Sequence, residues 1–107
     1  MSPLQFKRAN RSKELLEYLV KDGELPRVQL GTATISKSQR LPTEGWSLHD
    51  RHGEVSYVIR GSCEFHTVDR VLLLEEGDVL YNPRGTRHFV ENLQSESCVI
   101  FWVLVED

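Results

Sequence analysis

The sequence predicts an all-β domain folded as a barrel or a sandwich, and two observations lead to that prediction. From residue 28 onward, runs of β-branched and aromatic residues recur at intervals of about 8 to 12 residues, with turn residues between them. The chain has 107 residues, which is enough for one domain with a single hydrophobic core. The sequence contains no tandem repeat, linker or low-complexity segment that would divide this domain.

The N-terminal part differs from the rest, because its apolar pattern is helical. Apolar side chains recur at helical spacing within residues 13–22, Ser12 precedes them as a helix cap, and Gly23 follows where a residue with positive φ belongs. The sequence therefore predicts an arm and a short N-terminal α-helix within residues 1–27. The β-barrel domain is expected over residues 28–107.

Seven strands are expected in the β domain, each bounded by turn residues. Residues 37–45 contain Pro42 and Gly45 and are expected to form a loop. A tight corner is expected at Pro83 and Gly85, because proline fixes φ and glycine permits positive φ. The expected strands cover residues 28–35, 55–60, 63–68, 71–74, 79–81, 88–91 and 98–105.

Side-chain alternation assigns the two faces of the strand that follows Gly53. If Glu54 points inward, Ser56 and Val58 do so as well, and a buried carboxylate needs a partner such as histidine or a metal ion. The other face is large and apolar, so we expect the helix or a second subunit to cover it, and we expect a homodimer. The outward residues are Val55, Tyr57 and Ile59.

Composition excludes several classes of protein. Hydrophobic residues make up 39% of the chain and charged residues 27%, as in ordinary globular domains. The 13 basic and 16 acidic residues are well mixed and give a net charge of −3, so we expect neither nucleic acid nor a membrane as a partner. There is no signal-peptide pattern and no apolar run of about 18 residues, so we expect a cytoplasmic protein. Cys63 and Cys98 are expected to be buried, free thiols.

The segment from residue 77 to 92 carries a spaced set of turn residues, a histidine and an asparagine. Gly77 is followed by five residues, then Pro83-x-Gly85, two residues, His88, three residues and Asn92. This pattern matches every position of the second cupin motif, so the sequence resembles the cupin family. The resemblance implies a cupin, or jelly-roll, β-barrel.

The first cupin motif is only partly matched. In that motif, His-x-His is followed by three or four residues, a glutamate, six residues and a glycine. His49, Glu54 and Gly61 fit it, but Ser47 stands where the first histidine belongs, and the opening glycine is missing. The two motifs together span residues 45–92, nearly half of the chain.

The resemblance implies a divalent transition metal held by His49, Glu54 and His88. Two imidazoles and one carboxylate with open positions suit iron, and such sites also take Zn, Mn, Ni or Cu. His52 is a candidate fourth ligand only if Gly53 forms a bulge that re-aims the strand. The alternative is a metal-free hydrogen-bonded cluster of the same residues.

A small-molecule pocket is expected beside the metal. Ser47 either holds a metal-bound water or packs, and Arg87 either attracts an anionic substrate or is a solvated loop charge. The expected pocket residues are Ser47, Ser56, Tyr81 and Arg87.

Cupins include many enzymes as well as storage and sensor proteins, so the family leaves the reaction open. We expect a metalloenzyme that acts on a small organic acid or sugar-like molecule. The alternatives are a non-catalytic binding or sensor cupin, and a metal-free epimerase-like cupin that uses His88 with Tyr81.

Overall fold

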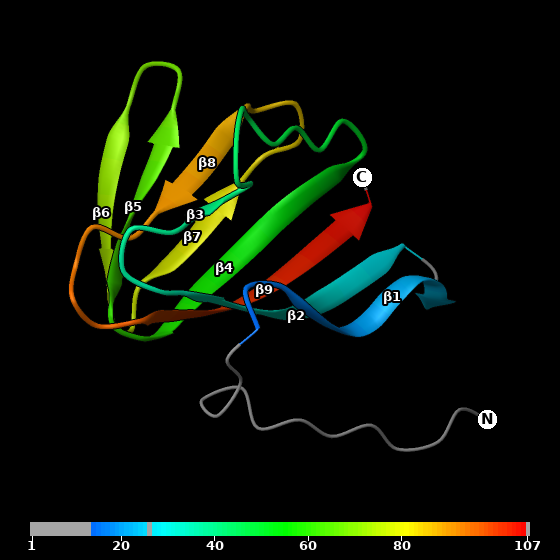
Figure 1. The fold of residues 1–107 in the computed structure, drawn as a ribbon. Helices are drawn as coiled ribbons and strands as arrows, with labels where there is room; N and C mark the ends of the chain where they lie inside the picture. Colours follow the sequence, from blue (N-terminus) through cyan, green and yellow to red (C-terminus); the bar gives the residue numbers. More distant parts are fainter. Residues whose placement is uncertain (1–13, 26, 107) are drawn as a thin grey trace.

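The computed structural model describes residues 14–25 and 27–106, and within them every regular element is a strand (Figure 1). None of the described residues forms a helix that is long and apolar enough to cross a membrane. The strands are β1 (Glu17–Leu25), β2 (Val28–Ile35), β3 (Arg40–Leu41), β4 (His52–Arg60), β5 (Ser62–Thr67), β6 (Val71–Glu75), β7 (Val79–Asn82), β8 (His88–Glu91) and β9 (Cys98–Glu106).

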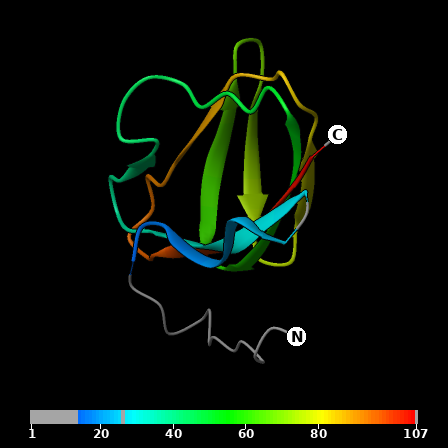
Figure 2. The same ribbon diagram turned by 90° about the vertical axis from the view of Figure 1, so that its right-hand side faces the viewer.

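The strands form two antiparallel sheets that face each other, which is the jelly-roll barrel that the sequence predicts (Figures 1 and 2). The larger sheet has the order β1-β2-β9-β4-β7, and the smaller sheet has the order β3-β8-β5-β6. All seven strands expected after residue 27 are present. The short strand β3 was not expected, because it lies in a segment rich in turn residues and pairs only with β8.

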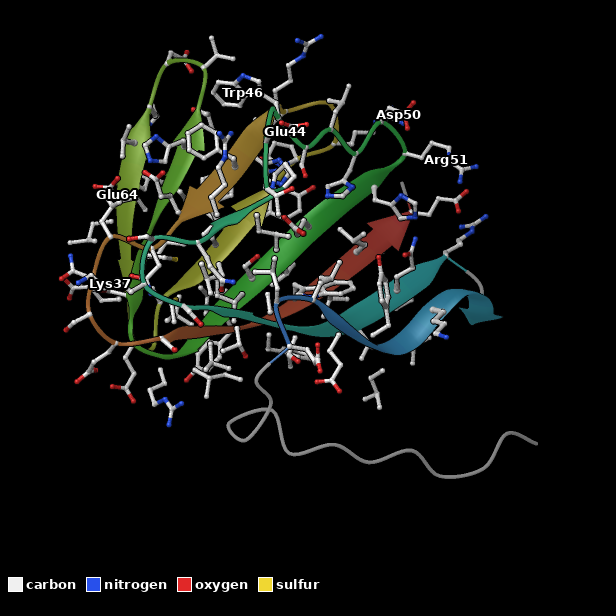
Figure 3. All side chains as sticks on the ribbon, viewed as in Figure 1. Lys37, Glu44, Trp46, Asp50, Arg51 and Glu64 are labelled. Carbon is white, nitrogen blue, oxygen red and sulfur yellow. The ribbon has the colours of Figure 1, made fainter. Side chains whose placement is uncertain are left out.

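Side chains from both sheets meet between them and form the core (Figure 3). Strand β9 lies in the middle of the larger sheet and pairs along its length with β2 and β4, which explains its long apolar run. Cys63 and Cys98 are both buried in this core, and both thiols are free. The main core cluster contains Ile35, Val58, Cys63, Phe65, Leu74, Cys98 and Ile100.

The N-terminal helix predicted over residues 13–22 is wrong for the described part of that segment, because residues 17–25 form β1. This strand pairs with β2, with Tyr18 opposite Gly31. A Cβ atom at Gly31 would lie 1.9 Å from the Glu17 carbonyl oxygen, so the missing side chain of Gly31 permits the close approach of β1. Pairing with the edge of β2 has outweighed the local preference of this segment for a helix. The arm expected over residues 1–11 lies outside the described residues.

Candidate metal centre

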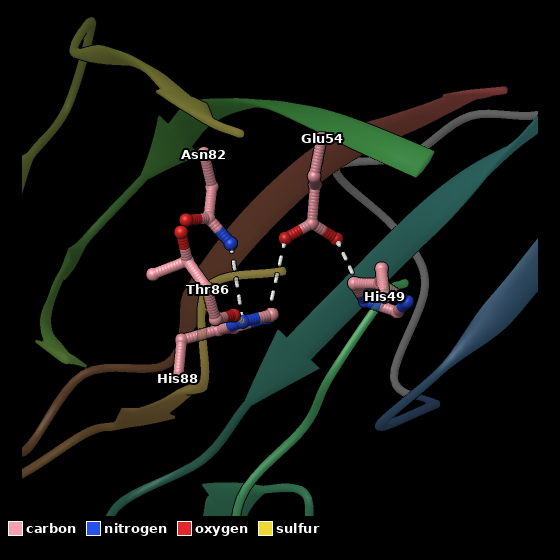
Figure 4. A network of polar contacts seen from close by, with 5 residues as sticks. All are labelled: His49, Glu54, Asn82, Thr86 and His88. Atoms are coloured by element: carbon pink, nitrogen blue, oxygen red, sulfur yellow. Dashed lines mark hydrogen bonds and ion pairs between the residues drawn. The ribbon is translucent and has the colours of Figure 1, made fainter. Parts of the chain in front are cut away.

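Two segments that are distant in the sequence bring two imidazoles and a carboxylate together (Figure 4). Glu54 lies on β4, opposite Leu104 of β9, and points inward. His88 is the first residue of β8, and His49 lies in the loop before β4. This loop is held against β8 by two backbone hydrogen bonds, since the Ser47 N–H donates to the His88 carbonyl and the His88 N–H donates to the Ser47 carbonyl.

The Glu54 carboxylate lies between the two imidazole rings (Figure 4). Its Oε1 atom is 3.4 Å from His88 Nε2, and its Oε2 atom is 3.9 Å from His49 Nε2. One ligand-type atom from each of the three side chains lies within 4.8 Å of the others. Small side-chain adjustments would therefore bring all three atoms onto one ion.

The Nδ1 atom of His88 has both a hydrogen-bond donor and an acceptor beside it. The Asn82 amide nitrogen and the Thr86 carbonyl oxygen each lie 3.1 Å from Nδ1. When Nδ1 carries the proton, it donates to the Thr86 carbonyl, and the Nε2 lone pair is available for a metal ion. When Nε2 carries the proton, it donates toward Glu54, and Nδ1 accepts from Asn82. Both tautomers are thus satisfied without movement of the ring.

Packing also fixes the orientation of the His88 ring. The ring of Phe65 is stacked against it, with centroids 5.3 Å apart and an interplanar angle of 16°. His88 itself is buried. A ligand that is held by packing and by hydrogen bonds at its second nitrogen is the usual arrangement in metal sites, so the residues present fit a divalent transition metal.

The pKa values of the two imidazoles shift in opposite directions. Burial alone lowers the pKa of His88, but hydrogen bonds with Glu54 and Thr86 outweigh burial, and the pKa is raised above its ordinary value. Burial lowers the pKa of His49, and attraction by Glu54 offsets only part of that decrease. His88 must therefore release a more tightly held proton than His49 before it can bind a metal ion.

A cavity of about 120 Å³ adjoins the three side chains. Its walls are mostly apolar, and Ser47 and Ser56 supply hydroxyl groups. Its titratable residues, among those that the structure describes, are His49, Glu54, His88 and Tyr18. The cavity is lined by Leu16, Tyr18, Ala33, Ile35, Leu41, Ser47, His49, Glu54, Ser56, His88, Val90, Ile100, Trp102 and Leu104.

The structure does not bring His52 into the group of mutually close ligands. The register between β4 and β9 is regular from His52 to Val58, so the bulge at Gly53 on which a fourth ligand depended is absent. His52 is the first residue of β4, two residues before Glu54, and lies opposite Glu106. Its side chain is therefore displaced along the strand by roughly 6 to 7 Å from that of Glu54.

Two of the expected pocket residues also lie elsewhere. Tyr81 is opposite Val55 on the outer face of the larger sheet and is 60% exposed, because Asn82 takes the inward position at the end of β7. Arg87 is exposed in the corner before β8 and does not line the cavity. The cavity wall instead contains Tyr18, which the sequence reasoning missed because its segment was read as a helix.

Comparisons with known proteins agree with this architecture. A sequence model of the cupin domain matches residues 39–104. The cupin domain of Cnp3 from Schizosaccharomyces pombe is 13% identical with a TM-score of 0.79, covering 94% of this chain and 68% of that chain. A cupin 2 conserved barrel domain protein from Salinispora arenicola is 17% identical with a TM-score of 0.76, covering 98% of this chain and 91% of that chain. No curated protein sequence matches the chain.

Proposed function

Since this chain belongs to the cupin family, we propose that it binds one divalent transition-metal ion inside the barrel and acts there on a small organic acid. One observation carries the proposal: His49, Glu54 and His88 converge, with their ligand atoms within 4.8 Å of one another, at the edge of an apolar cavity. The donor set suits Fe, Zn, Mn, Ni or Cu. A bound ion of this kind supplies Lewis acidity, and iron or copper adds redox chemistry.

The residues of the chain have separable roles in this proposal. Glu54 would contribute negative charge that offsets the charge of the ion, and His49 and His88 would hold the ion through the Nε2 atoms that face this carboxylate. Thr86 holds the proton of His88 at Nδ1 through its carbonyl oxygen and so keeps Nε2 unprotonated. If all three side chains bind the ion, Tyr18 remains as the titratable group of the described cavity wall that can move a proton.

The cavity favours a compact substrate with an apolar body. Its volume of about 120 Å³ is comparable with that of an engineered apolar cavity of about 150 Å³ that binds benzene. A sugar would bring many hydroxyl groups, whereas the side-chain hydroxyls of the described lining belong to Ser47, Ser56 and Tyr18. An organic acid would place its carboxylate toward the metal and its carbon chain against the apolar wall, so we prefer this class to a sugar-like substrate.

A non-catalytic binding or sensor cupin is the second candidate. Ser47 lines the cavity where the family motif has its first histidine, so the protein offers fewer imidazole ligands than the motif does. Binding tolerates a lost ligand better than catalysis does. The metal-free alternative requires His88 and Tyr81 as an acid–base pair, but His88 of β8 lines the cavity inside the barrel, whereas Tyr81 lies on the outer face of the larger sheet.

Elemental analysis of protein purified without chelators or an affinity metal tests the metal site. We expect His49→Ala, Glu54→Ala and His88→Ala each to remove one equivalent of metal, and His52→Ala to retain it. A metal content equal to that of the wild type in all three variants would refute the site. Turnover of small organic acids by the metal-loaded protein would support the enzyme, and stoichiometric binding without turnover would support the binding module.

We also propose that the protein forms a homodimer through the outer face of the larger sheet. Exposed apolar side chains stand in register across β7, β4 and β9, with Tyr57 opposite both Val79 and Phe101. Such a continuous apolar surface is usually covered. Val79→Asp should yield a monomer in sedimentation velocity. Val68→Asp is the control, because Val68 is about as exposed as Val79 (76% against 66%). It should leave the dimer intact, since Val68 lies in the β5–β6 turn, outside the proposed interface. A wild-type monomer at micromolar concentration would refute the dimer.

A further inference from the structure

A second group of metal-ligand side chains lies on the outer face of the smaller sheet, away from the cavity. Glu64 and His66 lie on β5, and Glu91 lies on β8. One ligand-type atom from each lies within 4.8 Å of the others, and all three residues are half-buried. Phe65, which lies between Glu64 and His66 in the sequence, points inward and stacks on His88. The two groups of candidate ligands are therefore on opposite sides of this sheet.

The two carboxylates of this group need a positive charge. Glu64 and Glu91 are directly opposite each other in the β5–β8 register, and like charges in that position repel. Within residues 14–25 and 27–106, no lysine or arginine forms an ion pair with either carboxylate. Arg40 is opposite Glu91 in the register, but its guanidinium lies over the Phe89 ring, 3.9 Å from the centroid, and donates to the Gly45 carbonyl.

The imidazole of the group is held in place before any ion binds. The His66 ring is stacked on the Phe89 ring, with centroids 4.2 Å apart and planes inclined by 12°. Two groups cannot occupy the same position about 4 Å above a ring, so His66 and Arg40 cover opposite faces of Phe89. Trp46 packs edge-on against the same ring, with centroids 5.0 Å apart.

The separation of two of the donor atoms already suits a small ion. His66 Nε2 lies 3.1 Å from Glu64 Oε1. Two ligands of one tetrahedral Zn²⁺, with bonds of about 2.0 to 2.1 Å, are separated by roughly 3.3 Å. The hydrogen bond between these atoms contains a proton that an ion can replace. Rotation of the Glu91 side chain would supply the third ligand from the neighbouring strand.

We propose that Glu64, His66 and Glu91 form a second divalent-cation site, on the outside of the barrel, that binds Zn²⁺. The imidazole favours Zn²⁺ over Ca²⁺ or Mg²⁺, which prefer oxygen ligands. Binding at Nε2 would leave the imidazole proton of His66 on Nδ1 and would remove the repulsion between the two carboxylates. The fourth position of the ion is open to water or to a ligand from another molecule. This site is independent of the metal centre inside the barrel.

Titration of the metal-free protein with Zn²⁺ against a chromophoric chelator tests the outer site by stoichiometry. The wild type should bind two equivalents, and His66→Gln and Glu91→Gln should each bind one. His88→Ala should also bind one, and the double variant with His66→Gln and His88→Ala should bind none. Glu76→Gln removes the same charge as Glu91→Gln from an exposed turn outside the group, and it should keep both equivalents.

The outcomes separate the two sites. Equal stoichiometry in the wild type and in both His66→Gln and Glu91→Gln would overturn the outer site. One equivalent that is lost in His66→Gln but retained in His88→Ala would support the outer site and refute the inner one. A cooperative thermal transition in each variant establishes that it is folded. If His66→Gln fails that check, Glu91→Gln decides the question, because its side chain takes no part in the stack on Phe89.

Discussion

Replacing Asn92 with alanine should lower the free energy of unfolding by about 4 to 6 kcal/mol. The Asn92 side chain is fully buried, and its amide nitrogen donates to the carbonyl oxygens of Ile35 and Glu96, each at 2.7 Å. Its amide oxygen accepts from the Gln94 N–H at 2.8 Å. One side chain thus ties the end of β2 to the loop between β8 and β9.

The magnitude follows from the fate of each partner. Three hydrogen bonds at about 1 kcal/mol each give about 3 kcal/mol, and a buried carbonyl left without a donor adds roughly 1 to 3 kcal/mol. Ile35 is fully buried, so its carbonyl incurs that additional cost, whereas Gln94 and Glu96 are exposed and their backbone groups can bind water. Urea denaturation of the metal-free protein should show the loss as a lower midpoint with an unchanged slope.

Two further variants test the reasoning. Asn92→Asp keeps the shape and the acceptor but loses both donors and places a carboxylate against two carbonyls, so it should destabilise at least as much as alanine. Gln94→Ala keeps the backbone N–H that Asn92 binds and should change stability by less than about 0.5 kcal/mol. A nearly neutral Asn92→Asp would show that shape rather than hydrogen bonding is what this position requires, and would refute the argument.

Three more predictions concern the metal centre and a turn. Zn²⁺ affinity at the inner site should fall by about tenfold per pH unit as the pH drops below the raised pKa of His88, because the proton on the His88 imidazole competes with the metal ion. An affinity that is constant with pH would contradict this prediction. Ser47→His should raise that affinity by at least about tenfold in the same titration, because it adds an imidazole to the cavity wall; an unchanged affinity would contradict this placement. Gly61→Ala should destabilise by roughly 3 kcal/mol or more in urea, because φ is +79° and the new Cβ would lie 2.4 Å from the Ser97 carbonyl oxygen. The control Gly85→Ala, with φ of +83° and open space, should cost only about 1 to 2 kcal/mol, and equal costs would show that the contact is unimportant.

Much of the inner site could be predicted from local sequence. His49, Glu54 and His88 belong to short motifs in which a glycine or proline fixes a turn and the next strand positions the ligand, so their spacing carries the geometry. The period of two along β4 also placed Ser56 in the cavity wall, beside Glu54. Whether the ligands hold a metal stays a prediction.

Other features depended on which strands become neighbours, which periodicity does not specify. The apolar residues around Tyr18 fit a helix as well as a strand. The segment forms the strand β1 because it can pair with the edge of β2, where Gly31 leaves room for it. Tyr81 was assigned to the pocket because it is close to the second motif in sequence, but its position in β7 turns it outward.

The sequence alone predicted seven of the eight strands after residue 27 and the tight corner at Pro83 and Gly85, because each depends on residues that are close together in the chain. Its resemblance to the cupin motifs predicted the three candidate inner ligands. The tertiary structure decided the path of the N-terminal segment, the actual wall of the cavity and the exclusion of His52 from the ligand group. It also placed Glu91 opposite Glu64, although the two are far apart in the sequence. Strand pairing across such a distance is selected by the packing of the whole barrel, so local residue patterns could not reveal the outer group of ligands.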